Sequence, residues 1–205
     1  MIKILVVSGS PVIESSTDIL LRHIAEGLVG SLKGKCESEV SFVKLNSILF
    51  RSCQACGVDP TPHWCFYEDL APELEKLAAC DCLLFGSPIY FDTVSAQAKA
   101  FIDRCNCFRP ADFESETGTR FIRRLKRTRP GAMVLVGGKD GHFEGARRVI
   151  AGFFKWVEVS NEGVLIYSPP DNMEKGSAAQ DSAILAKAAE LGKDLATLLL
   201  RQSEE

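Results

Sequence analysis

Three cysteines, a histidine and an aspartate occur together in the stretch CQACGVDPTPHWC, residues 53–65. Thiolate and imidazole groups at close spacing are ligands that zinc prefers, and structural zinc sites use four of them. Cys53, Cys56, Cys65 and His63 would form such a set, although His63 and Cys65 lie only two positions apart, which is tighter than the usual zinc spacing. The alternative is a stretch without metal, whose cysteines are free thiols or form an incidental Cys53–Cys56 disulfide. The residues alone leave both interpretations open.

A second polar stretch, SGSPVIESST at residues 8–17, carries five hydroxyl groups and leads into a predicted helix. It has a single glycine and no Gly-Lys pair, so it is neither a dinucleotide fingerprint nor a Walker loop. Hydroxyl donors and free backbone N–H groups at a helix N-terminus suit a single phosphate group, whose charge the helix dipole stabilises. One hydroxyl would be enough to cap the helix, so five indicate a phosphate site.

Two further stretches could contact the flat part of a ligand. GSPIYF, residues 86–91, combines a stiff proline with backbone donors beside aromatic side chains, which suits a partly polar ring. VGGKDGHFEGA, residues 136–146, begins with a glycine-rich run that lets backbone approach a ligand closely. Either stretch alone is also typical of an ordinary turn.

Each of these last three stretches follows a predicted β-strand. Apolar runs predict strands at 2–7, 39–45, 81–87, 132–136 and 163–167, and amphipathic periodicity predicts helices at 17–32, 67–79, 94–105, 143–156 and 178–200. The alternation predicts a three-layer α/β fold, with a doubly wound, five-stranded parallel sheet of flavodoxin-like order 2-1-3-4-5. Ligands of such sheets bind beyond the carboxyl ends of the strands, so the loops after strands one, three and four should converge.

Composition bounds the other possibilities. A chain of 205 residues, 46% of them hydrophobic, is expected to form one domain over residues 1–205. A net charge of -3 predicts no general attraction to nucleic acid or to a membrane surface. The N-terminal apolar run is too short for a signal or membrane helix, so a cytoplasmic protein is expected. In that reducing compartment four of the cysteines outside residues 53–65 are expected to be core residues, namely Cys80, Cys82, Cys105 and Cys107.

A basic run, RFIRRLKRTR, occupies residues 120–129. Its weak apolar face predicts a solvated helix. The alternative is that its arginines recognise the 2′-phosphate of NADPH.

The four stretches at residues 8–17, 53–65, 86–91 and 136–146, together with SAQAKAFIDR at residues 95–104, resemble the NAD(P)H-dependent FMN reductases. Within that family they resemble the iron–sulfur flavoproteins. The resemblance runs from residue 2 to about residue 156. It departs from the family where Ser15-Ser16-Thr17 replaces the common Gly-Asn-Thr, and where Val12 replaces a basic residue. The resemblance implies a set of FMN contacts: Ser10, Ser15, Ser16 and Thr17 at the phosphate; Ser87, Pro88, Ile89, Tyr90 and Phe91 along the isoalloxazine; Gly137, Gly138 and Gly141 on its other side.

The implied function is that of an FMN-dependent oxidoreductase. Hydride would pass from NAD(P)H to bound FMN and on to an acceptor, which could be a flavin, a quinone or a metal centre; no catalytic side-chain acid or base is required. The resemblance also implies a homo-oligomer. Two alternatives stay open: a non-enzymatic electron carrier of the flavodoxin type, and a zinc-binding regulatory module without flavin.

In the iron–sulfur flavoproteins four cysteines stand where this chain has three. Cys53, Cys56 and Cys65 match, and Asp59 occupies the remaining position. A [4Fe–4S] cluster favours four thiolates, and a carboxylate suits it less well. The cluster is therefore a doubtful cofactor, and the outcomes left open are an empty stretch, which we favour, a cluster with Asp59 as fourth ligand, or zinc.

Overall fold

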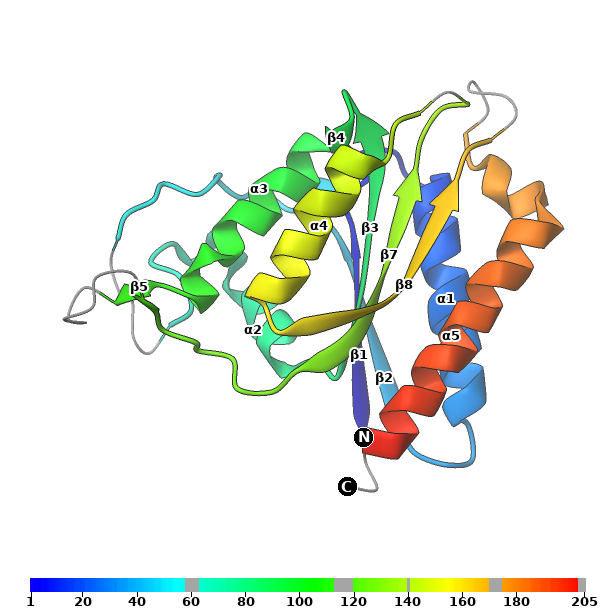
Figure 1. Cartoon of the computed structure of the whole chain (residues 1–205), viewed down its shortest axis with the longest axis horizontal. Helices are drawn as coiled ribbons and strands as arrows, with labels where there is room; N and C mark the ends of the chain where they lie inside the picture. The colour runs from blue at the N-terminus through cyan, green and yellow to red at the C-terminus, as the bar shows by residue number, and fades with distance from the viewer. Residues whose placement is uncertain (58–62, 113–119, 140, 170–174, 203–205) are drawn as a thin grey trace.

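The computed structural model describes residues 1–57, 63–112, 120–139, 141–169 and 175–202 (Figure 1). Its centre is a parallel sheet in which five long strands run in the order β2-β1-β3-β7-β8. Since these five follow one another in the chain, the arrangement confirms the predicted order 2-1-3-4-5. The strands are β1 (Ile2–Ser8), β2 (Ser38–Lys44), β3 (Cys82–Tyr90), β7 (Arg129–Val136) and β8 (Val159–Tyr167).

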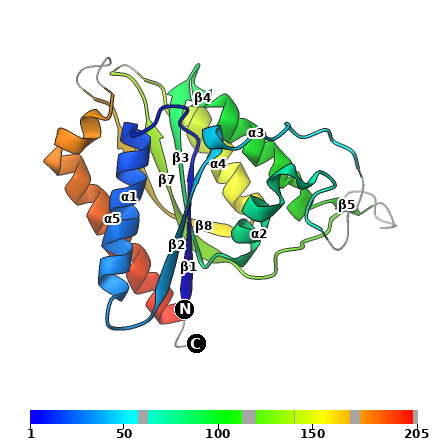
Figure 2. The same ribbon diagram turned by 180° about the vertical axis from the view of Figure 1, so that it is seen from behind.

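Helices cover both faces of this sheet. In Figures 1 and 2, α1 (Ser16–Leu32) and α5 (Ser182–Gln202) lie on one face. The other face carries α2 (Ala71–Ala79), α3 (Ala96–Arg104) and α4 (Glu144–Trp156). Short 3-10 turns are η1 (Leu45–Ser47), η2 (Glu68–Leu70), η3 (Cys105–Phe108) and η4 (Ser177–Gln180). Within the described residues, none of the helices is both long and apolar enough to cross a membrane.

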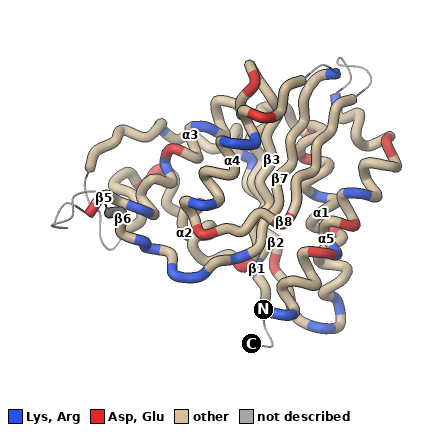
Figure 3. The backbone as a smooth tube through the Cα atoms, viewed as in Figure 1, with Lys and Arg blue, Asp and Glu red and all other residues tan. Residues whose placement is uncertain are grey.

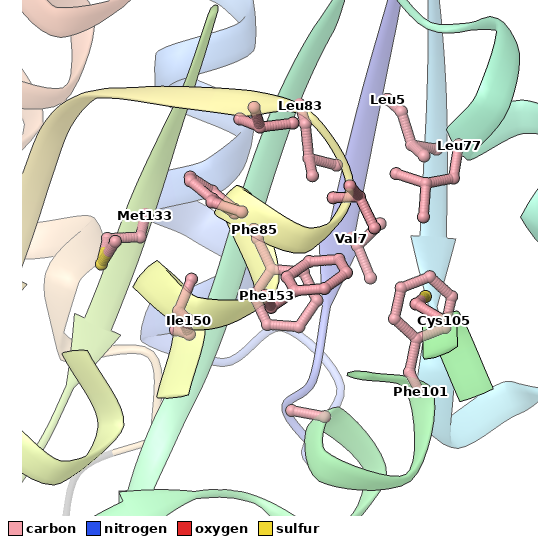
Figure 4. Close-up of a cluster of buried hydrophobic side chains, with 14 of the residues drawn as sticks. Leu5, Val7, Leu77, Leu83, Phe85, Phe101, Cys105, Met133, Ile150 and Phe153 are labelled. Atoms are coloured by element: carbon pink, nitrogen blue, oxygen red, sulfur yellow. The ribbon is translucent and has the colours of Figure 1, made fainter. Parts of the chain in front are cut away.

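Three aromatic side chains fix β3 against α3 and α4 (Figure 4). The ring centroids of Phe85, Phe101 and Phe153 lie 5.2–6.2 Å from one another, and all three rings are buried. Cys105 is buried in the same cluster. Because β3 ends in one of the predicted ligand loops, this packing also fixes that loop relative to the helices around it.

On the opposite face, α1 and α5 approach each other at glycines. A Cβ added at Gly192 would lie 2.2 Å from the carbonyl oxygen of Ile24, and one at Gly27 would lie 2.4 Å from that of Ala189. Neither position has room for a side chain while the helices stay where they are.

The structure extends β3 beyond its predicted end. The strand reaches Tyr90 and turns back through a two-residue hairpin to β4 (Thr93–Val94). Phe91 and Asp92, the two turn residues, have φ of 51° and 61°. Such turns usually carry glycine or asparagine, so Phe91-Asp92 gives no sequence signal for a hairpin.

The predicted helix at residues 120–129 is wrong. Arg120–Phe121 form strand β6, which pairs with β5 (Ala111–Asp112), and Arg129 already belongs to β7. Figure 3 shows the basic positions following the chain from β6 towards β7. Arg123 pairs with Glu158, and Arg127 pairs with Asp81. Charge-rich local sequence predicted a solvated helix, whereas these distant partners hold the segment in an extended form.

Candidate functional site

The three predicted ligand loops meet at the carboxyl ends of β1, β3 and β7. They enclose a pocket of ≈ 300 Å³. Nine of the twelve predicted cofactor residues line it: Ser10, Ser15, Ser16, Thr17, Pro88, Ile89, Tyr90, Gly137 and Gly138. We call it the flavin pocket, after the ligand that the sequence predicts there. Another hollow, of ≈ 330 Å³, lies around Lys3 and Lys76 at the amino end of the sheet, away from these loops.

Hydrogen bonds tie the first two loops together beneath the pocket. The amide of Gly9 donates to the carbonyl of Gly86 (2.8 Å), and the hydroxyl of Ser95 donates to the carbonyl of Gly9 (2.5 Å). The Ser95 amide in turn donates to the hydroxyl of Ser87 (2.9 Å). Ser87 is fully buried and is not among the residues that line the pocket. Its hydroxyl thus supports the loop, and its contact with a ligand stays a prediction.

The hydroxyl-rich loop ends in a capping box. The Ser15 hydroxyl accepts a hydrogen bond from the amide of Asp18 (3.2 Å), and the Asp18 carboxylate accepts one from the amide of Ser15 (3.3 Å). Asp18 also receives the hydroxyl of Ser8 (2.5 Å) and pairs with Lys44 (2.5 Å). The negative charge of Asp18 is therefore balanced by Lys44, which limits its repulsion of an anion at the start of α1.

A cation that sequence reasoning missed also lines the pocket. Lys175 and Gly176 precede η4 and border the hydroxyl-rich loop. Gly176 has φ of 70°, and a Cβ there would lie 2.8 Å from the carbonyl oxygen of Glu14. The Ser16 hydroxyl accepts a hydrogen bond from the amide of Ala178 (3.2 Å). The Lys-Gly pair beside the closing helix was the available signal, but nothing local connects it with a loop 160 positions earlier.

The hairpin after β3 forms the other wall. Tyr90 is 44% exposed and lines the pocket, whereas Phe91 is fully exposed at the tip and does not. A Cβ at Gly145 in α4 would lie 2.1 Å from the carbonyl oxygen of Asp92, so α4 packs directly against the hairpin. Gly141 also lies outside the lining residues, and its amide donates to the carbonyl of Gly138 (2.9 Å).

The cysteines of residues 53–65 are not gathered at one point. Cys56 is exposed, and Cys65 is half-buried and packs against the core beneath α2, α3 and α4. Asp59 lies outside the described residues. Over the ranges that the structure describes, no group of three or more His, Cys, Asp or Glu side chains is placed to hold a metal ion.

Arg104 fastens both ends of this stretch to α3. Its guanidinium donates to the carbonyls of Arg51 and Tyr67, at 2.8 Å each, and pairs with Asp69 at 2.7 Å. Burial opposes ionisation of Asp69, but the hydrogen bonds from Arg104 and from the Arg51 amide outweigh it, and the pKa of Asp69 lies below its ordinary value. The Arg104 side chain is 1% exposed and that of Asp69 is 27% exposed, so the pair lies at the edge of the core.

Arg124 fastens the second half of the stretch. It donates to the carbonyls of His63 (2.7 Å) and Trp64 (2.9 Å), and to that of Cys107 in η3 (3.2 Å). Its guanidinium lies 4.7 Å from the centre of the Trp64 ring, and that ring is 4.7 Å from Phe108.

These contacts bring Cys65 near η3. Burial is the main cause that raises the pKa of Cys107 to about 12, and the nearby Cys65 contributes to the same shift. The described residues thus place Cys65 beside η3 and do not present the four converging thiolates that a [4Fe–4S] cluster favours. Cys80, Cys82 and Cys105 are buried, as predicted, whereas Cys107 is partly buried and packs against the same core.

Comparison with known proteins places this geometry in a family. The family model described as NADPH-dependent FMN reductase matches residues 2–166. An iron–sulfur flavoprotein of Methanocaldococcus jannaschii is 27% identical over 203 residues, covering 96% of this chain and 97% of that protein. An iron–sulfur flavoprotein of Methanosarcina thermophila is 25% identical, with 96% and 95% covered. The solved NAD(P)H:quinone oxidoreductase of Methanothermobacter marburgensis has the same fold, with a TM-score of 0.66, 20% identity, and 94% and 95% of the two chains covered.

Proposed function

The chain belongs to the family of NADPH-dependent FMN reductases and is an oxidoreductase with FMN as its cofactor; on this premise we propose that it takes hydride from NAD(P)H at the flavin pocket and passes electrons to a small acceptor. The observation that carries the proposal is the convergence of the three loops on one pocket at the carboxyl edge of the sheet. FMN, when bound, supplies the hydride and electron chemistry. The protein's residues bind it, orient it and leave one side of it accessible.

The phosphate is proposed to lie against the start of α1. Ser10 and Thr17 line the pocket there, and the amino end of a helix favours an anion. Lys175 lines the same end of the pocket and adds a positive charge. Lys44 pairs with Asp18, so the carboxylate at the start of α1 is already balanced without Lys175.

The isoalloxazine is proposed to lie between the β3–β4 hairpin and the glycines that follow β7. Gly137 has no room for a side chain, because a Cβ there would lie 2.8 Å from the Phe143 ring. Backbone therefore forms that wall, and Ile89 and Tyr90 form the opposite one. The exposed position of Tyr90 suits a wall that NAD(P)H and the acceptor reach in turn.

We further propose that the stretch of residues 53–65 carries no cluster. Arg104 and Arg124 anchor the backbone at and around its ends. Among the described residues, Cys53, Cys56 and Cys65 do not come together as one group of ligands. Iron, sulfide and zinc analysis of protein purified without oxygen tests this. Near-stoichiometric iron and sulfide would contradict it. The cytoplasmic location and the homo-oligomer stay predictions.

A spectrum and a rate test the proposed activity. We expect purified protein to be yellow, or to become so on adding FMN, and to oxidise NADH or NADPH steadily when a quinone or free flavin is supplied. A yellow protein that turns over neither nucleotide would instead be an electron carrier. A protein that gains no chromophore from FMN would contradict the pocket assignment.

A further inference from the structure

A large hollow of ≈ 840 Å³ adjoins the flavin pocket on the side of α1. It lies between the start of α1, the end of β2 and the η4 turn. The two hollows share Lys175 and Gly176 as lining residues, so they meet at the end of the flavin pocket where the phosphate is proposed to lie. The proposed activity leaves this second hollow without a role.

The junction between the hollows is held by local contacts. Gly176, with φ of 70°, packs against the carbonyl of Glu14, which itself has φ of 54°. The Ser16 hydroxyl accepts from the amide of Ala178 (3.2 Å) and lies 3.5 Å from the Ser177 hydroxyl. Two turns that are far apart in the sequence are thus held against each other at the junction. Glu14 is a non-glycine residue in the left-handed region, and such residues are more frequent at functional sites.

The walls of this hollow combine a stacking surface with positive charge. The Arg22 guanidinium lies 4.2 Å from the centre of the Phe42 ring, and the Arg22 side chain is exposed. A guanidinium plane stacks well on aromatic bases. Ile13 adds apolar surface, and Lys175 brings an ammonium group to the same hollow. Of the two carboxylates that also line it, Asp18 is paired with Lys44, and Glu14 is the other. A flat heteroaromatic ring joined to a phosphate matches these walls.

We propose that this hollow binds the adenylate half of FAD, so that the chain accepts FAD as well as FMN. The inference rests on the proposed function. FAD is FMN extended at its phosphate by an adenylate, and the hollow begins at the phosphate end of the flavin pocket. NAD(P)H also carries an adenylate, but its nicotinamide must reach the ring near Tyr90, at the other end of the pocket. The position of the hollow therefore favours FAD.

Titration of flavin-free protein with FMN and with FAD, followed by flavin fluorescence, tests the proposal. We expect FAD to bind about tenfold more tightly than FMN, the gain that one stacked base provides. Arg22→Ala should remove about that tenfold gain for FAD and leave FMN affinity unchanged. Arg148→Ala is the matched control, because Arg148 is also an exposed arginine, lies on α4 and does not line the hollow, and should change neither affinity.

Each other outcome has a definite meaning. Equal affinities for the two flavins, or an equal loss for both in Arg22→Ala, would overturn the inference while leaving the proposed function standing. Binding of AMP to FMN-loaded protein in competition with NADPH, without any advantage for FAD, would assign the hollow to the nucleotide substrate and also overturn it. Failure of both flavins to bind would overturn the proposed function itself.

Discussion

At the scale of single residues, several predicted phosphate ligands also have structural roles. Ser15 caps α1, Ser16 holds the η4 turn, and the Ser10 hydroxyl closes a turn with Val12. Thr17 differs, because its methyl group faces Gly86 and would lie 2.8 Å from a Cβ there. The sequence predicted a hydroxyl cluster correctly but could not separate these roles, since they depend on partners up to 162 positions away.

Thr17→Val should therefore weaken FMN binding without disturbing the fold. Valine keeps the methyl group that faces Gly86 and removes the hydroxyl, and a hydrogen bond to a charged group contributes about 1.5–3 kcal/mol. Flavin titration measures the loss. Thr197→Val is the control and should leave FMN affinity intact, because the Thr197 hydroxyl donates to the Lys193 carbonyl on the exposed side of α5. Equal affinities in the two variants would contradict a phosphate contact at Thr17.

The Asp69–Arg104 pair predicts a response to acid. Because the folded-state pKa of Asp69 lies below its ordinary value of 3.8, its contribution to stability is present above that value and is lost as pH falls through the folded pKa. Below about pH 4 we expect the docked stretch to loosen and Trp64 emission to shift towards that of exposed tryptophan. Asp69→Asn should give the shifted emission already at neutral pH. An unchanged pH profile in Asp69→Asn would contradict the assignment.

At the scale of elements, periodicity predicted all five long strands and the helices between them, because buried faces repeat locally. It failed where contacts are remote. The turn at Phe91-Asp92 lacks the usual turn residues, and Lys175 reaches the flavin pocket only through the packing of η4 on α1. The prediction of a helix at residues 120–129 is wrong because the partners of its arginines, such as Glu158 and the His63 carbonyl, are far away in sequence.

Replacing Arg124 or Arg127 by alanine should change the stability of the protein by different amounts, because the two side chains make different contacts. Arg124→Ala removes hydrogen bonds to three backbone carbonyls and the contact with Trp64, so we expect a loss of about 1–3 kcal/mol in unfolding free energy and faster proteolysis near residues 63–65. Arg127→Ala removes an ion pair with Asp81 and a single hydrogen bond to the Cys80 carbonyl from a side chain that is 61% exposed, and should cost less than about 1 kcal/mol. Limited proteolysis and denaturant unfolding compare the two. Similar behaviour of both variants would show that Arg124 does not hold the stretch.

At the scale of the whole molecule, the close contact of α1 with α5 completes one layer of the fold. Buried side chains of both helices pack with those of β1, β3, β7 and β8 in a single cluster. The sequence predicted both helices but not their separation, which is set by Gly27 and Gly192 facing backbone of the partner helix. Small residues in a helix have no periodic signal that distinguishes a close crossing from a solvent-facing position.

Two glycine substitutions test this crossing. Gly192→Ala would force the helices apart, and overpacking of this kind costs about 1–3 kcal/mol. Gly30→Ala, in α1 with no atom within 4 Å of the added Cβ, should stabilise the protein by about 0.5–1 kcal/mol, since alanine favours helix. Denaturant unfolding of both variants gives the comparison. A stabilising Gly192→Ala would contradict the close approach.

The same layer has a consequence for how the protein is made. α5 follows, in the chain, every strand that it covers. While a ribosome is still translating residues 182–202, α5 does not yet cover this face of the sheet. At that stage α1 is the helix that shields the apolar side chains of Leu84, Val134 and Leu165 from water. A nascent chain at that stage presents an uncovered sheet face, which is the kind of surface that chaperones bind and that promotes aggregation. Translation arrest or proteolytic trimming before α5 should therefore yield a protein that needs chaperones to stay dissolved, even with every flavin-pocket residue present.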